Sequence, residues 1–188
     1  MENYIERELK ILVSKEQFQK ILNSYEFKKP IIQTNTYYDT NNQKIKHMNG
    51  ALRIRTIKNT HIFTLKIKKD SITHYEYEKE IQTTNINEIK DPEILGWIQQ
   101  YDIPTNIKPI TSFRTERYTY NFEHGQLCAD ITSYENHIDY ELEYEYIDNH
   151  DGISFFNHIL NNINTKYKKN CPSKIARAMN DQNLCVKR

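Results

Sequence analysis

The chain has 188 residues, a length that fits one domain with a hydrophobic core of its own. Its formal net charge of +1 gives no reason to expect binding to a nucleic-acid polymer or to a membrane surface. The sequence shows no signal peptide and no apolar run that could span a membrane. Its three cysteines, Cys128, Cys171 and Cys185, show no metal-ligand spacing, so we expect no disulfide framework and a cytoplasmic location.

Polar and apolar residues alternate with a period of two far more often than with the helical period. In chain order, the pattern predicts a strand over 3–12, a helix over 15–24, strands over 31–39, 50–57, 61–69 and 73–82, a helix over 86–100, strands over 108–121, 125–133 and 136–147, a helix over 151–165 and a short helix near 172–180. Ser14, followed by Gln17, predicts a capping box at the start of the first helix.

Long strands with helices attached outside them indicate a barrel. The composition agrees, since 14 tyrosines and only 4 glycines favour strands with few tight turns. We find no internal repeat and no domain boundary, and therefore expect a mainly β (α+β) fold that forms a single domain over residues 1–188.

The first strand carries two carboxylates and an ammonium on one face. Glu6, Glu8 and Lys10 are spaced two residues apart, and side chains at that spacing share one side of a strand. Neighbouring carboxylates repel unless a positive charge lies between them, and a divalent metal is a common solution. The seven histidines show no metal-ligand spacing, so we expect them on the surface or in hydrogen bonds.

Other predicted strands also carry charges with a period of two, and the signs are sorted by strand. The further members are Arg53 and Arg55; Lys66 and Lys68; Glu76, Glu78 and Glu80; and Glu141, Glu143 and Glu145. Each strand alone fits the solvent face of an ordinary antiparallel sheet. A solvated face needs no such sorting, however, and adjacent like charges repel. Guanidinium and ammonium groups suit phosphate oxygens, and clustered carboxylates suit Mg²⁺ or Mn²⁺.

The ordered set of motifs resembles the CYTH superfamily, also called triphosphate tunnel metalloenzymes, and most of all its bacterial subgroup in Firmicutes. The motifs are ERELK at 6–10, LRIR at 52–55, TLKIK at 64–68, YEYEKE at 75–80, FRTERY at 113–118, ADITSY at 129–134 and YELEYE at 140–145. The resemblance spans nearly the whole chain and implies a closed eight-stranded antiparallel β-barrel, the triphosphate tunnel, with flanking helices.

The resemblance also implies roles for individual residues. Metal would be bound by Glu6, Glu8, Glu78, Asp130, Glu141 and Glu143. Triphosphate would be bound by Lys10, Arg53, Arg55, Lys66, Lys68, Arg114, Arg117 and Lys174, with Glu6, Glu8, Lys10, Arg53 and Arg55 as the catalytic set. Arg114 ranks lower, because it lies on the opposite face from Arg117 unless a bulge intervenes. Which of Glu141, Glu143 and Glu145 bind metal stays open.

Two positions depart from the family pattern. His74 stands where an arginine is frequent, two residues before the acidic pair of the fifth strand, and Ile67 stands where a glycine commonly follows the tunnel lysine. Both departures bear on substrate preference more than on the fold.

The expected activity is hydrolysis of a triphosphate with Mg²⁺ or Mn²⁺. Inorganic tripolyphosphate is the first substrate, and nucleoside and thiamine triphosphates come next. An adenylate cyclase and a binding module that senses polyphosphate or nucleotide without turnover are the alternatives. The expected partner is thus a small-molecule triphosphate, with no nucleic-acid polymer and no membrane, and the chain would be a monomer or a homodimer.

Overall fold

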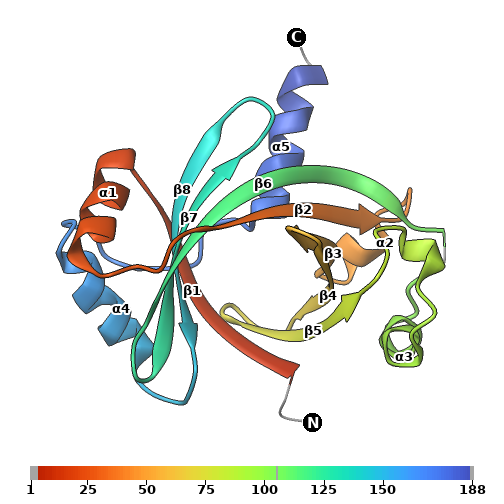
Figure 1. Ribbon diagram of the computed structural model, residues 1–188, viewed down its shortest axis with the longest axis horizontal. Coiled ribbons are helices and arrows are strands. Elements are labelled where there is room, and N and C mark those ends of the chain that lie inside the picture. Colours follow the sequence, from red (N-terminus) through yellow and green to blue (C-terminus); the bar gives the residue numbers. More distant parts are fainter. Residues whose placement is uncertain (1–3, 105, 187–188) are drawn as a thin grey trace.

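Eight strands close into one antiparallel barrel in the order β1-β5-β4-β3-β2-β6-β7-β8 (Figure 1). The computed structural model describes residues 4–104 and 106–186, with side chains of the last helix described up to residue 181. The strands are β1 (Ile5–Val13), β2 (Ile31–Asp39), β3 (Gly50–Ile57), β4 (Thr60–Lys68), β5 (Thr73–Ile81), β6 (Lys108–Asn121), β7 (Gly125–Ser133) and β8 (Ile138–Tyr146). The predicted closed eight-stranded barrel is confirmed.

The helices lie outside the barrel. They are α1 (Lys15–Ser24), α2 (Lys44–His47), α3 (Pro92–Gln100), α4 (Gly152–Asn161) and α5 (Lys174–Val186), with a 3-10 turn, η2 (Ile86–Glu88), before α3. In Figure 1, α1 and α4 lie on one side of the barrel, α3 lies on the opposite side, and α5 rises beside β6. None of the helices in the described part of the chain has both the length and the apolar character needed to cross a membrane.

Three helix predictions need correction. The helix expected over 86–100 is interrupted, because the side chain of Asp91 caps a new helix that has Pro92 at its first turn. The helix expected over 151–165 ends at Asn161, and the four-residue helix α2 was not predicted. The predicted start of the first strand at residue 3 and the side chain of Cys185 lie outside the described residues.

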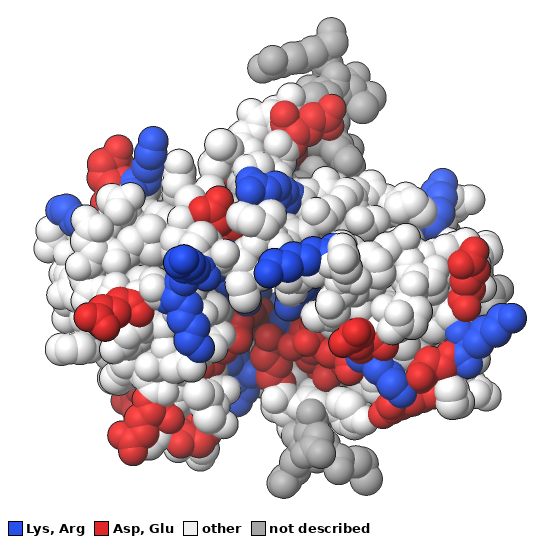
Figure 2. All heavy atoms as spheres, viewed as in Figure 1, with Lys and Arg blue, Asp and Glu red and all other residues white. Residues whose placement is uncertain are grey.

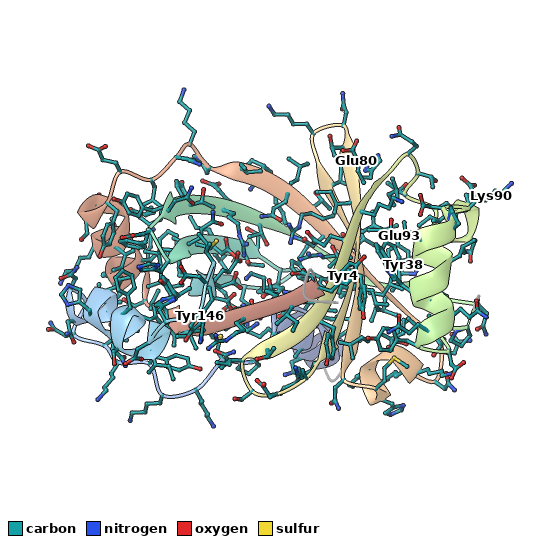
Figure 3. The ribbon with its side chains drawn as sticks, turned by 90° about the horizontal axis from the view of Figure 1, so that it is seen from below. Tyr4, Tyr38, Glu80, Lys90, Glu93 and Tyr146 are labelled. Carbon is teal, nitrogen blue, oxygen red and sulfur yellow. The ribbon has the colours of Figure 1, made fainter. Side chains whose placement is uncertain are left out.

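The two larger hydrophobic clusters lie outside the barrel, between its wall and the helices. One cluster packs Trp97 and Ile94 of α3 against the outer side chains of β3, β4 and β5. At this side, the hydroxyl of Tyr4 donates a hydrogen bond to Glu93 of α3 (Figure 3). A second cluster packs α1 and α4 against β1, β7 and β8. A third, smaller cluster lies between β2, β6 and α5, partly on the cavity side. Elsewhere the strands bury an apolar face outward, so their polar face points into the barrel.

Candidate active site in the barrel tunnel

Charged side chains from all around the barrel line one internal cavity of about 960 Å³. Its lining includes Glu6, Glu8, Lys10, Arg53, Arg55, Lys66, Lys68, His74, Arg117, Asp130, Glu143, Glu145 and Lys174. Figure 2 shows acidic side chains gathered in a hollow near the middle of the molecule, with basic side chains in and around it. The structure therefore brings most of the predicted site residues together.

The first carboxylate cluster joins β1 to β5. One ligand atom each of Glu6, Glu8 and His74 lies within 4.8 Å of the others, so these residues could share a metal ion. The ammonium of Lys66 lies 2.5 Å from Glu6 Oε2 and 3.9 Å from Glu8 Oε2, and Lys10 forms an ion pair with Glu8. Burial alone would raise the pKa of Glu8, but Lys66 and Lys10 lower that pKa to about 2. Glu8 is therefore ionised at neutral pH, as a metal ligand must be.

One buried atom of this cluster, His74 Nδ1, has no hydrogen-bond partner among the described residues, whereas Glu6 Oε2 is paired with the ammonium of Lys66. Burial, together with the nearby Lys66, lowers the pKa of His74, which favours the neutral imidazole. Buried polar atoms without a partner are rare in native proteins. A cation placed between the imidazole and the carboxylates would give His74 Nδ1 a partner, so the residues present fit a metal ion.

The second carboxylate cluster joins β7, β8 and the start of α5. Asp130, Glu141 and Glu143 are all buried, and they too could share a metal ion. The ammonium of Lys174 lies 2.9 Å from Asp130 and 2.7 Å from Glu143, and it also contacts Glu141. Burial raises the pKa of Glu141 to about 7. Burial acts on Glu143 in the same direction, but Lys174 and Arg117 hold the pKa of that carboxyl well below its ordinary value.

Two arginines connect this second cluster to the strands around it. Arg117 donates two hydrogen bonds to Asp130, from Nε at 2.9 Å and from Nη2 at 2.7 Å, and one to Glu145 at 3.1 Å. Arg177 of α5 forms 2.6 Å ion pairs with both Glu141 and Asp139. The carboxylates of this cluster therefore each have a cationic partner within the chain.

Arg53 and Arg55 lie side by side on the inner face of β3 and differ in their partners. Arg53 donates hydrogen bonds to Thr64 at 3.1 Å and to Glu78 at 3.2 Å. The Nε atoms of both arginines are buried without a hydrogen-bond partner in the described part of the chain. Burial, with the neighbouring Arg53 and Arg117, lowers the pKa of Arg55 to about 10. Both arginines line the cavity, and each keeps a donor without a hydrogen-bond partner in this part of the chain.

Three predicted site residues, Arg114, Glu78 and Lys68, lie outside the two clusters, and one cluster member, Glu141, does not line the cavity. Arg114 is on the outer face of β6, where 53% of its side chain is exposed and Glu116 is 4.0 Å away, so it does not reach the cavity. Glu78 accepts hydrogen bonds from Arg53 and Thr64 and joins neither carboxylate cluster. Lys68 lines the cavity but is exposed. Glu141 lies behind the lining, in contact with Lys174 and Arg177.

Four residues of the site were not among the predicted site residues. Glu76 and Glu145 share the inward face of predicted neighbours, and Glu76 Oε1 lies 3.5 Å from the ammonium of Lys66. The period-two pattern of the sequence includes both, but it leaves Glu145 as an open alternative and assigns no role to Glu76. His74 precedes Glu76 by two residues and so follows the same pattern. Arg177 follows Lys174 by three residues, a helical spacing that places two side chains on one face.

The sequence matches a family model for the CYTH domain over residues 4–179. The chain belongs to the CYTH family. YjbK of Bacillus subtilis (strain 168), a proposed triphosphatase, is 28% identical over 165 residues, which are 85% of this chain and 87% of YjbK. The resemblance to CYTH proteins of Firmicutes is thereby confirmed.

Solved structures of similar proteins share the fold. A proposed adenylate cyclase from Bacillus halodurans superposes with a TM-score of 0.79 at 28% identity, covering 93% of this chain and 97% of its own. HpAC1 from Hippeastrum, a proposed adenylyl cyclase described as having a dominant triphosphatase activity, gives a TM-score of 0.77 at 22% identity and covers 95% of this chain and 96% of its own. The CYTH barrel is therefore common to proteins described as cyclases and as triphosphatases.

Proposed function

We propose that this chain is a divalent-metal-dependent triphosphatase that binds its substrate in the barrel tunnel, with inorganic tripolyphosphate as the first substrate. The observation that carries the proposal is the arginine pair of β3. The buried Nε atoms of Arg53 and Arg55 have no hydrogen-bond partner among the described residues, and guanidinium groups match phosphate oxygens in shape and charge. The likeness to YjbK, a proposed triphosphatase, supports the same reaction.

The rest of the cavity supplies the other groups that this reaction needs. The phosphate-binding set would be Lys10, Arg53, Arg55, Lys66, Arg117 and Lys174, and the metal-binding set would be Glu6, Glu8, Asp130, Glu141 and Glu143. Mg²⁺ or Mn²⁺, when bound, would offset phosphate charge and make a bound water more acidic. Fixed positive groups around the transferred phosphoryl would stabilise the charge that develops on its oxygens.

The lysines have a second role in this proposal. Lys66 and Lys174 each lie between carboxylates, where they neutralise charge that would otherwise be buried. If these carboxylates held a metal, each ammonium could bind a phosphate oxygen of the substrate instead. Metal and triphosphate would then bind more tightly together than either does alone.

A substrate with an organic group is the second candidate, and the size of the cavity favours it. A volume of about 960 Å³ lies near the top of the range of roughly 300–1,000 Å³ that is usual for pockets that hold drug-sized ligands. A nucleoside triphosphate or thiamine triphosphate would use more of that volume than tripolyphosphate would.

The first test measures phosphate release from tripolyphosphate, ATP and thiamine triphosphate, each with Mg²⁺, Mn²⁺, Ca²⁺ or EDTA. We expect metal-dependent release that is fastest with tripolyphosphate. Formation of cyclic AMP from ATP would identify a cyclase instead. Tight binding of tripolyphosphate without release of phosphate under any of these metals would identify a binding module.

The second test uses Arg55→Ala. Loss of a guanidinium that stabilises transferred phosphoryl oxygens should lower kcat by about a hundredfold or more. Thermal stability should not fall, because no ion pair to Arg55 is found among the described residues and its Nε atom lacks a hydrogen bond. Arg114→Ala, which changes an arginine on the outer face, is the matched control and should retain activity. Full activity of Arg55→Ala would contradict the proposal.

A further inference from the structure

We propose that His74 is a nitrogen ligand of the metal held by Glu6 and Glu8, and that it gives this site a preference for first-row transition ions over Mg²⁺. The inference rests on the proposed function, since it names a ligand of the metal which that function requires. It departs from the sequence-based expectation that every histidine has a surface or hydrogen-bonding role.

The register of β1 and β5 puts the imidazole beside the carboxylates. His74 is the Cα partner of Glu6 in the β1–β5 pairing, and both residues line the same cavity. His74 Nδ1 lies 3.9 Å from Glu8 Oε1. One atom from each of these three residues lies within 4.8 Å of the other two, so small side-chain rotations would bring all three to a single ion.

One ring nitrogen of the imidazole is unsatisfied in the described part of the chain. Its Nδ1 is buried and has no hydrogen-bond partner there. An imidazole kept only for packing would leave a polar atom unsatisfied, at a cost of roughly 1–3 kcal/mol. Glu6 Oε2, from the facing strand, is paired with the ammonium of Lys66, and Glu8 Oε1 lies 3.9 Å from the imidazole. One cation held by these carboxylates would satisfy the nitrogen.

The choice of ligand atoms predicts the metal. Carboxylate oxygens alone suit Mg²⁺ and Ca²⁺, whereas imidazole nitrogen raises affinity for transition ions such as Co²⁺ and Ni²⁺. The second cluster, made of Asp130, Glu141 and Glu143, offers oxygen only. The two clusters of one cavity should therefore differ in metal preference, and only the cluster that contains His74 can place nitrogen on the metal.

Pulsed electron paramagnetic resonance of the full chain loaded with Mn²⁺ alone tests this directly. We expect ¹⁴N modulation from a directly bound imidazole in the wild type, and its loss in His74→Asn. The matched control is His61→Asn, since His61 Nδ1 shares a 2.9 Å hydrogen bond with the hydroxyl of Thr56 and the residue does not line the cavity. That variant should keep the modulation.

Calorimetric titration with Co²⁺ and with Mg²⁺ measures the affinity of the site for each metal and so its metal preference. His74→Asn should weaken Co²⁺ binding by about tenfold and change Mg²⁺ binding by less than about threefold. Circular dichroism would establish that the variants are folded. Absence of nitrogen modulation in the wild type, unchanged modulation in His74→Asn, or failure to bind Mn²⁺ at all would overturn the inference.

These results separate the inference from the proposed function. Triphosphate hydrolysis without nitrogen modulation would leave the function standing and remove His74 from the metal. Nitrogen modulation that His74→Asn abolishes, without hydrolysis of any triphosphate, would keep the ligand assignment and remove the proposed function.

Discussion

At the scale of single residues, the tunnel is governed by the cost of burying charge. An isolated buried carboxylate is expensive, and removing one partner of a buried ion pair leaves the other uncompensated. Asp130, Glu141 and Glu143 are buried around Lys174, whose side chain is only 12% exposed. One ammonium therefore offsets the negative charge of three carboxylates, which a neutral side chain at this position could not do.

Lys174→Met should consequently destabilise the metal-free protein. We expect the free energy of unfolding in EDTA to fall by about 3–5 kcal/mol, the usual cost of breaking a buried ion pair. Saturating Mn²⁺ should recover much of this loss, because a cation that binds only the folded state stabilises it. Urea unfolding followed by circular dichroism measures both effects. Lys90→Met, at an exposed position, is the control, and equal midpoints for Lys174→Met and wild type in EDTA would contradict the prediction.

Sequence patterns predict which residues face the tunnel but not which residues meet there. The period of two placed Glu6, Glu8, Arg53, Arg55 and Lys66 on inner faces, because alternation is a property of each strand alone. The contacts of His74 with the β1 carboxylates depend instead on the register between β1 and β5, and nothing local in the sequence specifies that register. Arg177 was missed for the same reason, since it meets Glu141 only through the docking of α5.

At the scale of elements, local signals set where helices begin. The capping box of α1 is present as predicted: Ser14 Oγ accepts a hydrogen bond from the backbone of Gln17 at 3.2 Å, and the side chain of Gln17 accepts one from the backbone of Ser14 at 2.9 Å. The helix then buries Phe18 and Ile21 against the barrel. The prediction of one helix over 86–100 was wrong, because Asp91 and Pro92 start a new helix. The apolar periodicity of the segment did not reveal this second start.

Ser14→Ala should therefore weaken α1. Loss of the cap should lower the free energy of unfolding by about 1 kcal/mol, and chemical denaturation would measure it. Ser14→Thr keeps the hydroxyl and should lose clearly less. Activity in either variant should match the wild type, since Ser14 does not line the cavity. A loss in Ser14→Thr as large as in Ser14→Ala would argue against the cap as the cause.

At the scale of the whole molecule, the closed barrel buries acidic and basic groups together, and their ionisation depends on pH. Burial, with the nearby Glu6 and Glu78, raises the pKa of Glu76 to about 8 despite Lys66. Burial and Glu143 raise that of Glu141 to about 7, whereas Lys66 and Lys10 lower that of Glu8 to about 2. Some carboxyls of the metal-free tunnel thus keep their protons near neutral pH while others are ionised.

The stability of the metal-free protein should fall on both sides of a maximum. A raised carboxyl pKa favours the folded state at low pH, and this contribution is lost as pH rises from the ordinary value of 4.5 towards about 8, where Glu76 must ionise. The lowered pKa of Glu8 acts oppositely, and its contribution is lost as pH falls from 4.5 towards about 2. Thermal unfolding in EDTA over this range measures the curve.

Glu76→Gln is the control for the upper limb, since it removes the group that must ionise. Its stability should decline less steeply between pH 5 and 8 than that of the wild type. Identical slopes would show that Glu76 has nearly the same pKa in the folded protein as in the unfolded chain. That result would contradict the prediction.

The position of β1 in the ring bears on how the protein is made. β1 pairs on one side with β5 and on the other with β8, where Lys10 lies opposite Glu143. These two residues are far apart in the chain, so the ring cannot close during synthesis until β8 has left the ribosome. Contacts between such distant segments form slowly. Glu6, Glu8 and His74 need only β1 and β5 to meet, whereas Lys10 meets Glu143 only on final closure. A nascent chain could thus assemble its first carboxylate cluster well before its second.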